Sequence, residues 1–105
     1  MVVLLAYYKV RPDADREALG AIGRRMHELV TRPEFGFRGS KYYQGADGDS
    51  LTVYEFEDLD GLERWRREPE HLAAQQRGPE FFEYLVNEVC IVERRDPMGS
   101  IPLDA

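Results

Sequence analysis

The stretch GFRGSKYYQGADGDSLTVYEFE, at residues 36–57, predicts a β-hairpin. Two stretches that carry aromatic side chains flank a short polar segment, and that segment contains Asp47-Gly48. This dipeptide is typical of the tight turn that joins two antiparallel strands. We therefore expect strands at 36–45 and 50–57, paired antiparallel.

On the N-terminal side of the hairpin, the sequence predicts one strand and one helix. Residues 2–11 are apolar at both odd and even positions, which is typical of a strand covered on both faces, and Pro12 ends it. Asp13 or Asp15 can cap a helix that ends before Pro33. The apolar residues of this helix recur at helical spacing and form one stripe: Leu19, Ile22, Met26, Leu29 and Val30.

On the C-terminal side, the sequence predicts two helical segments and a last strand. The first segment opens at Asp58 and contains Trp65, and Pro69 is expected to break or kink it. A second helix is expected at about 70–77, followed by a short turn and a strand at 86–94.

The resulting order is β-α-β-β-α-β, the split pattern of the ferredoxin-like fold in the α+β class. It predicts a four-stranded antiparallel sheet with the helices on one face, in a domain at 1–95 with a flexible C-terminal tail at 96–105. The other face is left bare, and it carries Val3, Leu5, Tyr7, Leu51 and Val53. Burying each large apolar side chain is worth roughly 1.5–3 kcal/mol, so the bare face predicts a homodimer.

Composition argues against several classes of partner. The net charge is −6 and no basic patch stands out, which argues against nucleic-acid binding. No apolar run approaches the roughly 20 residues that span a bilayer, so no membrane partner is expected. Cys90 is the lone cysteine, which excludes an intramolecular disulfide and favours a reducing, cytoplasmic location. We expect its thiol to be packed in the core, and we find no zinc signature.

Several short motifs follow one another along the chain at characteristic spacings. They are Val10-Arg11-Pro12, Gly36-Phe37-Arg38-Gly39, Tyr54-Glu55-Phe56-Glu57-Asp58, Leu62-Glu63-Arg64-Trp65, Pro69-Glu70-His71-Leu72-Ala73-Ala74 and the strand at 86–94. In this order they resemble the antibiotic biosynthesis monooxygenase family, within the dimeric α/β-barrel superfamily. The resemblance covers about residues 2–95.

The resemblance implies a dimer with a pocket in each subunit, between the sheet and the helices. Many family members oxygenate anthrones or hydroquinones with dioxygen and use no metal or flavin, so the expected cofactor set is empty. The function that follows is a cofactor-independent monooxygenase for a polycyclic aromatic substrate, in secondary metabolism. A polyketide cyclase or isomerase, or a binding protein for aromatic ligands without catalysis, stays open as an alternative.

Trp65 and His71 are the predicted catalytic residues. Six residues correspond to ~600°, so on an unbroken helix the two side chains would lie ~120° apart, but a break at Pro69 could turn both toward one pocket. In the oxygenase branch this segment supplies a tryptophan and, six residues later, a hydrogen-bonding side chain. The resemblance thus implies that His71 is the base that deprotonates the substrate. The alternative is a core tryptophan beside a surface histidine.

Five aromatic residues are predicted to line the substrate pocket: Tyr8, Phe37, Tyr54, Phe56 and Phe82. Ordinary core packing is the alternative for each of them. Buried tyrosines need a partner for the hydroxyl group, and this favours a pocket with polar groups at its tips. His27 lies outside the apolar stripe of its helix, and we expect it at the surface.

A sister branch of the superfamily binds and degrades haem, and the residues here disfavour that activity. Its iron-ligating histidine lies nine or ten residues after the tryptophan, where this chain has Ala74 and Gln75. Its asparagine on the first strand falls on Ala6, or on Tyr7 if the register shifts by one. None of these four residues supplies the required group.

Overall fold

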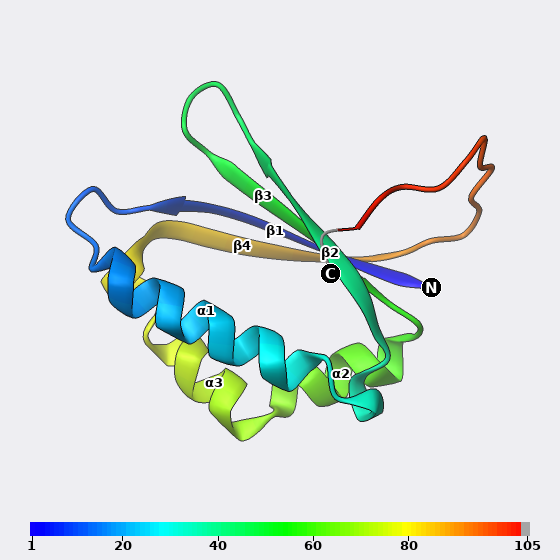
Figure 1. The fold of residues 1–105 in the computed structure, drawn as a ribbon, viewed down its shortest axis with the longest axis horizontal. Coiled ribbons are helices and arrows are strands. Elements are labelled where there is room, and N and C mark those ends of the chain that lie inside the picture. Colours follow the sequence, from blue (N-terminus) through cyan, green and yellow to red (C-terminus); the bar gives the residue numbers. More distant parts are fainter. Residues whose placement is uncertain (104–105) are drawn as a thin grey trace.

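A computed structural model of the chain describes residues 1–103 and shows a four-stranded sheet with its helices on one face (Figure 1). The elements are β1 (Val2–Val10), α1 (Arg16–Val30), the short 3-10 helix η1 (Pro33–Phe35), β2 (Phe37–Gln44), β3 (Ser50–Phe56), α2 (Leu59–Arg67), α3 (Pro69–Gln76), α4 (Gly78–Phe81) and β4 (Phe82–Ile91).

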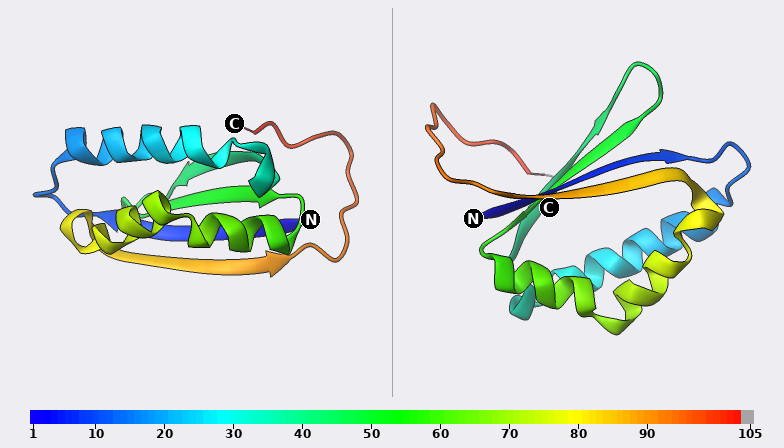
Figure 2. Two further views of the ribbon diagram at one scale, coloured as in Figure 1. Left: turned by 90° about the horizontal axis from the view of Figure 1, so that it is seen from below. Right: turned by 180° about the vertical axis from the view of Figure 1, so that it is seen from behind.

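The strands lie in the order β2-β3-β1-β4, and every neighbouring pair is antiparallel. Two views at right angles show α1 and the α2–α3 segment side by side beneath the sheet (Figure 2). This confirms the ferredoxin-like α+β fold that the sequence predicts.

The β2–β3 hairpin turns where Asp47-Gly48 predicts. Gly48 has φ +88°, a conformation that side chains other than glycine rarely adopt. The Asp47 carboxylate accepts a hydrogen bond from the Asp49 backbone N–H at 3.0 Å, and the Gly45 N–H donates to the Asp49 carbonyl at 2.8 Å. A short polar segment therefore specifies the pairing of the edge strand β2 with the central strand β3.

The last strand differs from the prediction at both ends. It begins at Phe82, whereas 86 was expected, because β1 continues to Val10 and offers pairing groups there: Val10 lies opposite Phe82, and Tyr8 lies opposite Leu85. It ends at Ile91, whereas 94 was expected.

The helix starts follow the predicted caps. The Asp15 carboxylate accepts a hydrogen bond from the Ala18 N–H at 3.0 Å and begins α1. The Asp58 carboxylate does the same for the Gly61 N–H at 2.8 Å and begins α2.

The hydrophobic core lies at one end of the layer between the sheet and the helices. It is built from Val2, Leu29, Val30, Phe35, Phe56, Leu62 and Trp65. Phe56 and Leu62 are fully buried. The core therefore joins the N-terminal end of β1 and the end of β3 to α1, η1 and α2. It does not fill the space between α3 and the sheet.

The face of the sheet without helices carries the side chains that the sequence places there. Val3, Leu5, Tyr7, Leu51 and Val53 are half-buried on this outer face. Cys90 lies opposite Val3, so its thiol lies on the outer face as well. The prediction of a core thiol is wrong, because strand alternation directs it away from the helices.

After β4, residues 92–103 contain no helix or strand. Arg95 of this segment donates a hydrogen bond to the Glu55 carboxylate on the outer face, at 2.9 Å. The boundary at 95 and the flexibility of the tail at 96–105 stay predictions, and residues 104–105 lie outside the described residues. Among residues 1–103, no helix is long and apolar enough to cross a membrane.

Candidate active site

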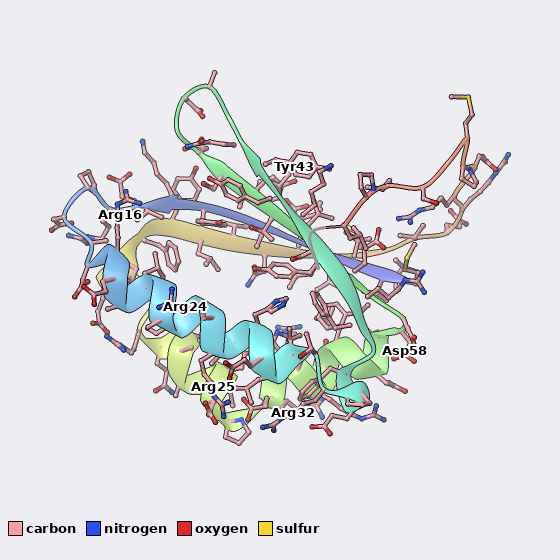
Figure 3. All side chains as sticks on the ribbon, in the orientation of Figure 1. Arg16, Arg24, Arg25, Arg32, Tyr43 and Asp58 are labelled. Atoms are coloured by element: carbon pink, nitrogen blue, oxygen red, sulfur yellow. The ribbon has the colours of Figure 1, made fainter. Side chains whose placement is uncertain are left out.

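A cavity of about 960 Å³ lies between the sheet and the helices. Its floor is the helix-facing side of the sheet, and α1 and α3 form its walls. Leu19, Ile22 and Met26 of the apolar α1 stripe line it, and Met26 also packs against the core. The volume is within the range of small-molecule sites. Figure 3 shows side chains that extend into the space between the layers from both the sheet and the helices.

Trp65 and His71 meet at the wall of this cavity. Their rings are stacked, with 4.0 Å between centroids and 16° between planes. Trp65 is 6% exposed and belongs to the core, whereas His71 is half-buried, and both line the cavity. The two side chains therefore share a surface, which a continuous helix would not allow.

The break between α2 and α3 produces this arrangement. Glu68 ends α2 in an extended conformation, with φ −60° and ψ 127°. A residue before proline is held in that region by the proline ring, here that of Pro69. The Glu68 carboxylate then accepts a hydrogen bond from the His71 backbone N–H at 2.8 Å and caps α3. The chain thus turns between Trp65 and His71 and brings them together.

The position of the proton on His71 follows from its contacts. Nδ1 lies 2.9 Å from the Trp65 carbonyl oxygen. A carbonyl can only accept, so Nδ1 carries the proton and Nε2 of the neutral ring keeps a lone pair. The nearest partner of Nε2 is the Gln75 amide nitrogen, at 3.5 Å, which is the limit of a hydrogen bond. His71 is therefore arranged as a proton acceptor.

The surroundings also keep this imidazole neutral. Burial lowers the pKa of His71 below its ordinary value, and the nearby Arg66 guanidinium adds to this effect. The hydrogen bond to the Trp65 carbonyl and the Glu68 carboxylate act in the opposite direction, but burial is the largest effect. At neutral pH His71 is therefore a free base.

The predicted aromatic residues divide into two groups. Phe37, Tyr54 and Phe82 line the cavity. Phe56 lies fully buried in the core, away from the lining, although it shares its strand face with Tyr54. Tyr8 lies behind the lining, where its ring packs edge-on against Phe82 at 5.4 Å.

The floor of the cavity carries polar groups that are not among the predicted site residues. The Thr52 hydroxyl forms a 3.2 Å hydrogen bond with the Tyr8 hydroxyl. Burial raises the pKa of Tyr54, so its hydroxyl stays protonated. Ser40 and Asn87 line the same floor. Strand parity was the signal for Thr52, because it lies two positions before Tyr54.

Two further contacts shape the walls. Arg25 on α1 forms a two-point ion pair with Glu70 on α3, at 2.9 and 2.8 Å, and this exposed pair joins the two helices at the protein surface. His27 is exposed as predicted, but it also reaches the rim of the cavity, where its ring lies edge-on to Phe37 at 6.3 Å. Within residues 1–103, no three His, Cys, Asp or Glu side chains are grouped as a metal site would require.

The sequence matches a protein family and a curated relative. The family model described as "Antibiotic biosynthesis monooxygenase" matches residues 1–77. The uncharacterized protein YqjZ of Bacillus subtilis (strain 168) is 33% identical over 77 residues, which cover 72% of this chain and 67% of that protein.

Solved structures share the fold. Rv0793 from Mycobacterium tuberculosis is 26% identical with a TM-score of 0.72, over 93% of this chain and 98% of that one. SnoaB, a cofactor-independent oxygenase from Streptomyces nogalater, is 12% identical with a TM-score of 0.71, over 91% and 96% of the two chains. A dimeric ferredoxin-like protein of unknown function from Thermobifida fusca is 13% identical with a TM-score of 0.64, over 87% and 90%. At these identities the last two likenesses concern the fold alone.

Proposed function

Because this chain belongs to the antibiotic biosynthesis monooxygenase family, we propose that it is a cofactor-independent monooxygenase acting with dioxygen on a polycyclic aromatic substrate of the anthrone or hydroquinone type. The observation that carries the proposal is His71: a neutral imidazole, stacked on Trp65, with its Nε2 lone pair at the wall of a cavity lined by aliphatic, aromatic and polar side chains.

For an anthrone, the proposed reaction converts a ring CH₂ group into a carbonyl and consumes one dioxygen. Nε2 of His71 accepts the first proton, and the resulting carbanion transfers an electron to dioxygen and then forms a carbon–oxygen bond to it. Loss of the second carbon-bound proton breaks the O–O bond. The departing oxygen combines with that hydrogen and the proton on His71 and leaves as water, so one oxygen atom stays in the product.

The remaining site residues support these steps. Phe37, Phe82 and the apolar residues of α1 exclude water from a planar ligand. The protonated Tyr54 hydroxyl can donate a hydrogen bond to oxygen as negative charge develops there. Trp65 holds the imidazole by stacking and through its carbonyl group.

The proposal also covers assembly and location. The half-buried apolar outer face would be covered by a second copy, giving a homodimer. The lone Cys90 fits a reducing cytoplasm. Haem degradation is left out, because Ala74 and Gln75 lie at the cavity wall where haem-degrading relatives hold the iron ligand.

The test is oxygen uptake by the purified, metal-free protein with a panel of anthrones and hydroquinones, followed by product mass under ¹⁸O₂. His71→Gln keeps an N–H donor for the Trp65 carbonyl but removes the base, and we expect kcat/KM to fall about 10²- to 10⁴-fold. Arg24→Gln, on the exposed side of α1 and outside the cavity lining, is the control and should stay near the wild type. Full activity in His71→Gln would contradict the proposal.

The same base and cavity would also serve a cyclase or isomerase, since proton removal at Nε2 needs no dioxygen. Product mass separates the two functions. Turnover that leaves the mass unchanged, or lowers it by one water without ¹⁸O, would favour cyclisation. Tight ligand binding without turnover would favour a binding protein.

A further inference from the structure

The outer face of the sheet carries opposite charges at its two edges. Lys41 of β2 lies opposite Val53 of β3, Val53 lies opposite Leu5 of β1, and Leu5 lies opposite Glu88 of β4. Residues directly opposite each other share a face of the sheet. These four residues therefore form one row, with a positive end, two apolar members and a negative end.

The two charges of this row cannot meet within one subunit. Three strand spacings separate them, which is about 14 Å. Among the described residues neither Lys41 nor Glu88 takes part in an ion pair, and the Lys41 ammonium lies 5.8 Å from the centroid of the Tyr43 ring on the same face. Both charges are thus available to a molecule that docks on this face.

This inference rests on the homodimer proposed above and deepens it. We propose that the second copy docks on the outer face with the two-fold axis running parallel to the strands, so that Lys41 of each subunit pairs with Glu88 of the partner subunit. The dimer would then hold two such ion pairs, one on each side of the apolar centre formed by Leu5 and Val53.

The positions of these charges favour this axis over a two-fold axis that runs across the strands. A two-fold axis along the strands exchanges the β2 and β4 edges, so the positive end of the row faces the negative end. An axis across the strands through this row would place Lys41 against a second Lys41 and Glu88 against a second Glu88. Sheets pack about 10 Å apart, a gap that a lysine and a glutamate side chain can bridge together.

The neighbouring rows fit the same arrangement. On one side lie Tyr43, Leu51, Tyr7 and Val86, a row without charge, and Tyr43 points away from the helices (Figure 3). On the other side lie Gly39, Glu55, Val3 and Cys90. Glu55 is only 4% exposed, but Arg95 already neutralises it at 2.9 Å. A second copy would therefore bury no unpaired carboxylate of this row.

The test is a charge exchange, read as the dimer dissociation constant from sedimentation equilibrium. Lys41→Glu and Glu88→Lys each create two like-charge contacts, and we expect each to weaken the dimer about tenfold or more. The double variant restores opposite charges and should return to within a few-fold of the wild type. Arg24→Glu, on the exposed side of α1, makes the same change in net charge as Lys41→Glu and should have no effect.

A second measurement uses the wild-type protein alone. Zero-length carbodiimide cross-linking of mixed ¹⁴N- and ¹⁵N-labelled protein should yield a Lys41–Glu88 peptide that carries both labels. The proposed axis would be overturned if neither single change altered the dimer dissociation constant. It would also be overturned if the double variant formed no tighter a dimer than the weaker single variant. A wild-type monomer would overturn the pairing itself. Neither measurement depends on oxygen uptake. The proposed dimer axis can therefore be refuted independently of the proposed monooxygenase activity.

Discussion

His71 owes its proposed role to contacts made by its near neighbours. The Trp65 carbonyl places the proton on Nδ1, and the Glu68 carboxylate holds the backbone N–H. The indole ring covers one face of the imidazole, and burial lowers its pKa. A histidine in solution has none of these constraints, so the local structure makes this side chain a neutral, oriented base.

The pKa of His71 predicts the acid side of the pH profile. The base works in its neutral form, so kcat/KM should fall as the pH falls through this pKa. Because burial places the pKa below the ordinary value of about 6.5, the fall should be centred below pH 6.5. Trp65 is the only tryptophan, and protonation of the stacked ring should quench its fluorescence at the same pH without substrate. An acid limb above pH 6.5, or a titration that survives in His71→Gln, would contradict this assignment.

At the scale of elements, the short helix α3 depends on its ends and not on a buried face. None of its residues is buried. Pro69 and the Glu68 cap hold its N-terminal end, and the Arg25–Glu70 ion pair ties it to α1. The wall that carries His71 is therefore positioned by a turn and by surface contacts.

Pro69→Ala should disturb the site more than the fold. Without the proline ring, Glu68 can adopt a helical conformation, so α2 and α3 can merge and His71 turns by up to about 120° away from Trp65. We expect a lower kcat and a smaller pH-dependent change in Trp65 fluorescence, with the midpoint of urea unfolding little changed. Pro12→Ala, in the exposed turn between β1 and α1, is the control. If the fluorescence titration of Trp65 is unchanged in Pro69→Ala, the chain break at Pro69 does not hold Trp65 and His71 together.

For the whole molecule, the two faces of one sheet have different environments. The helices cover one face and enclose the cavity. Among residues 1–103 no helix or strand covers the outer face, where the apolar residues are half-buried and Arg95 reaches Glu55. A domain of this size gains stability when a second copy covers such a face.

Pairing on this face predicts that thermal stability depends on concentration. For a dimer, Tm rises with protein concentration by mass action. Leu5→Glu places a carboxylate in the apolar centre of the face and should remove this dependence while the far-UV circular dichroism spectrum of the subunit is kept. Calorimetry over a hundredfold range of protein concentration measures it. A wild-type Tm that does not change over that range would argue against the dimer.

By itself, the sequence determined the features that depend on neighbouring residues. The hairpin at Asp47-Gly48, a helix cap at Asp13 or Asp15 and the break at Pro69 follow from backbone preferences of a few residues, and the structure selects Asp15. Strand alternation also placed Leu5 and Val53 on the bare face. These features are local or periodic, so they need no knowledge of the packing.

The tertiary structure alone decided what lies against each side chain. Phe56 and Tyr54 share a strand face, yet α2 and η1 cover Phe56 whereas Tyr54 faces the cavity. The start of β4 at Phe82 depends on pairing with β1, and the contact of Trp65 with His71 depends on the angle of the chain at Glu68. Alternation fixes the direction of a side chain, but its surroundings depend on where distant segments cross, and the sequence pattern does not contain that information.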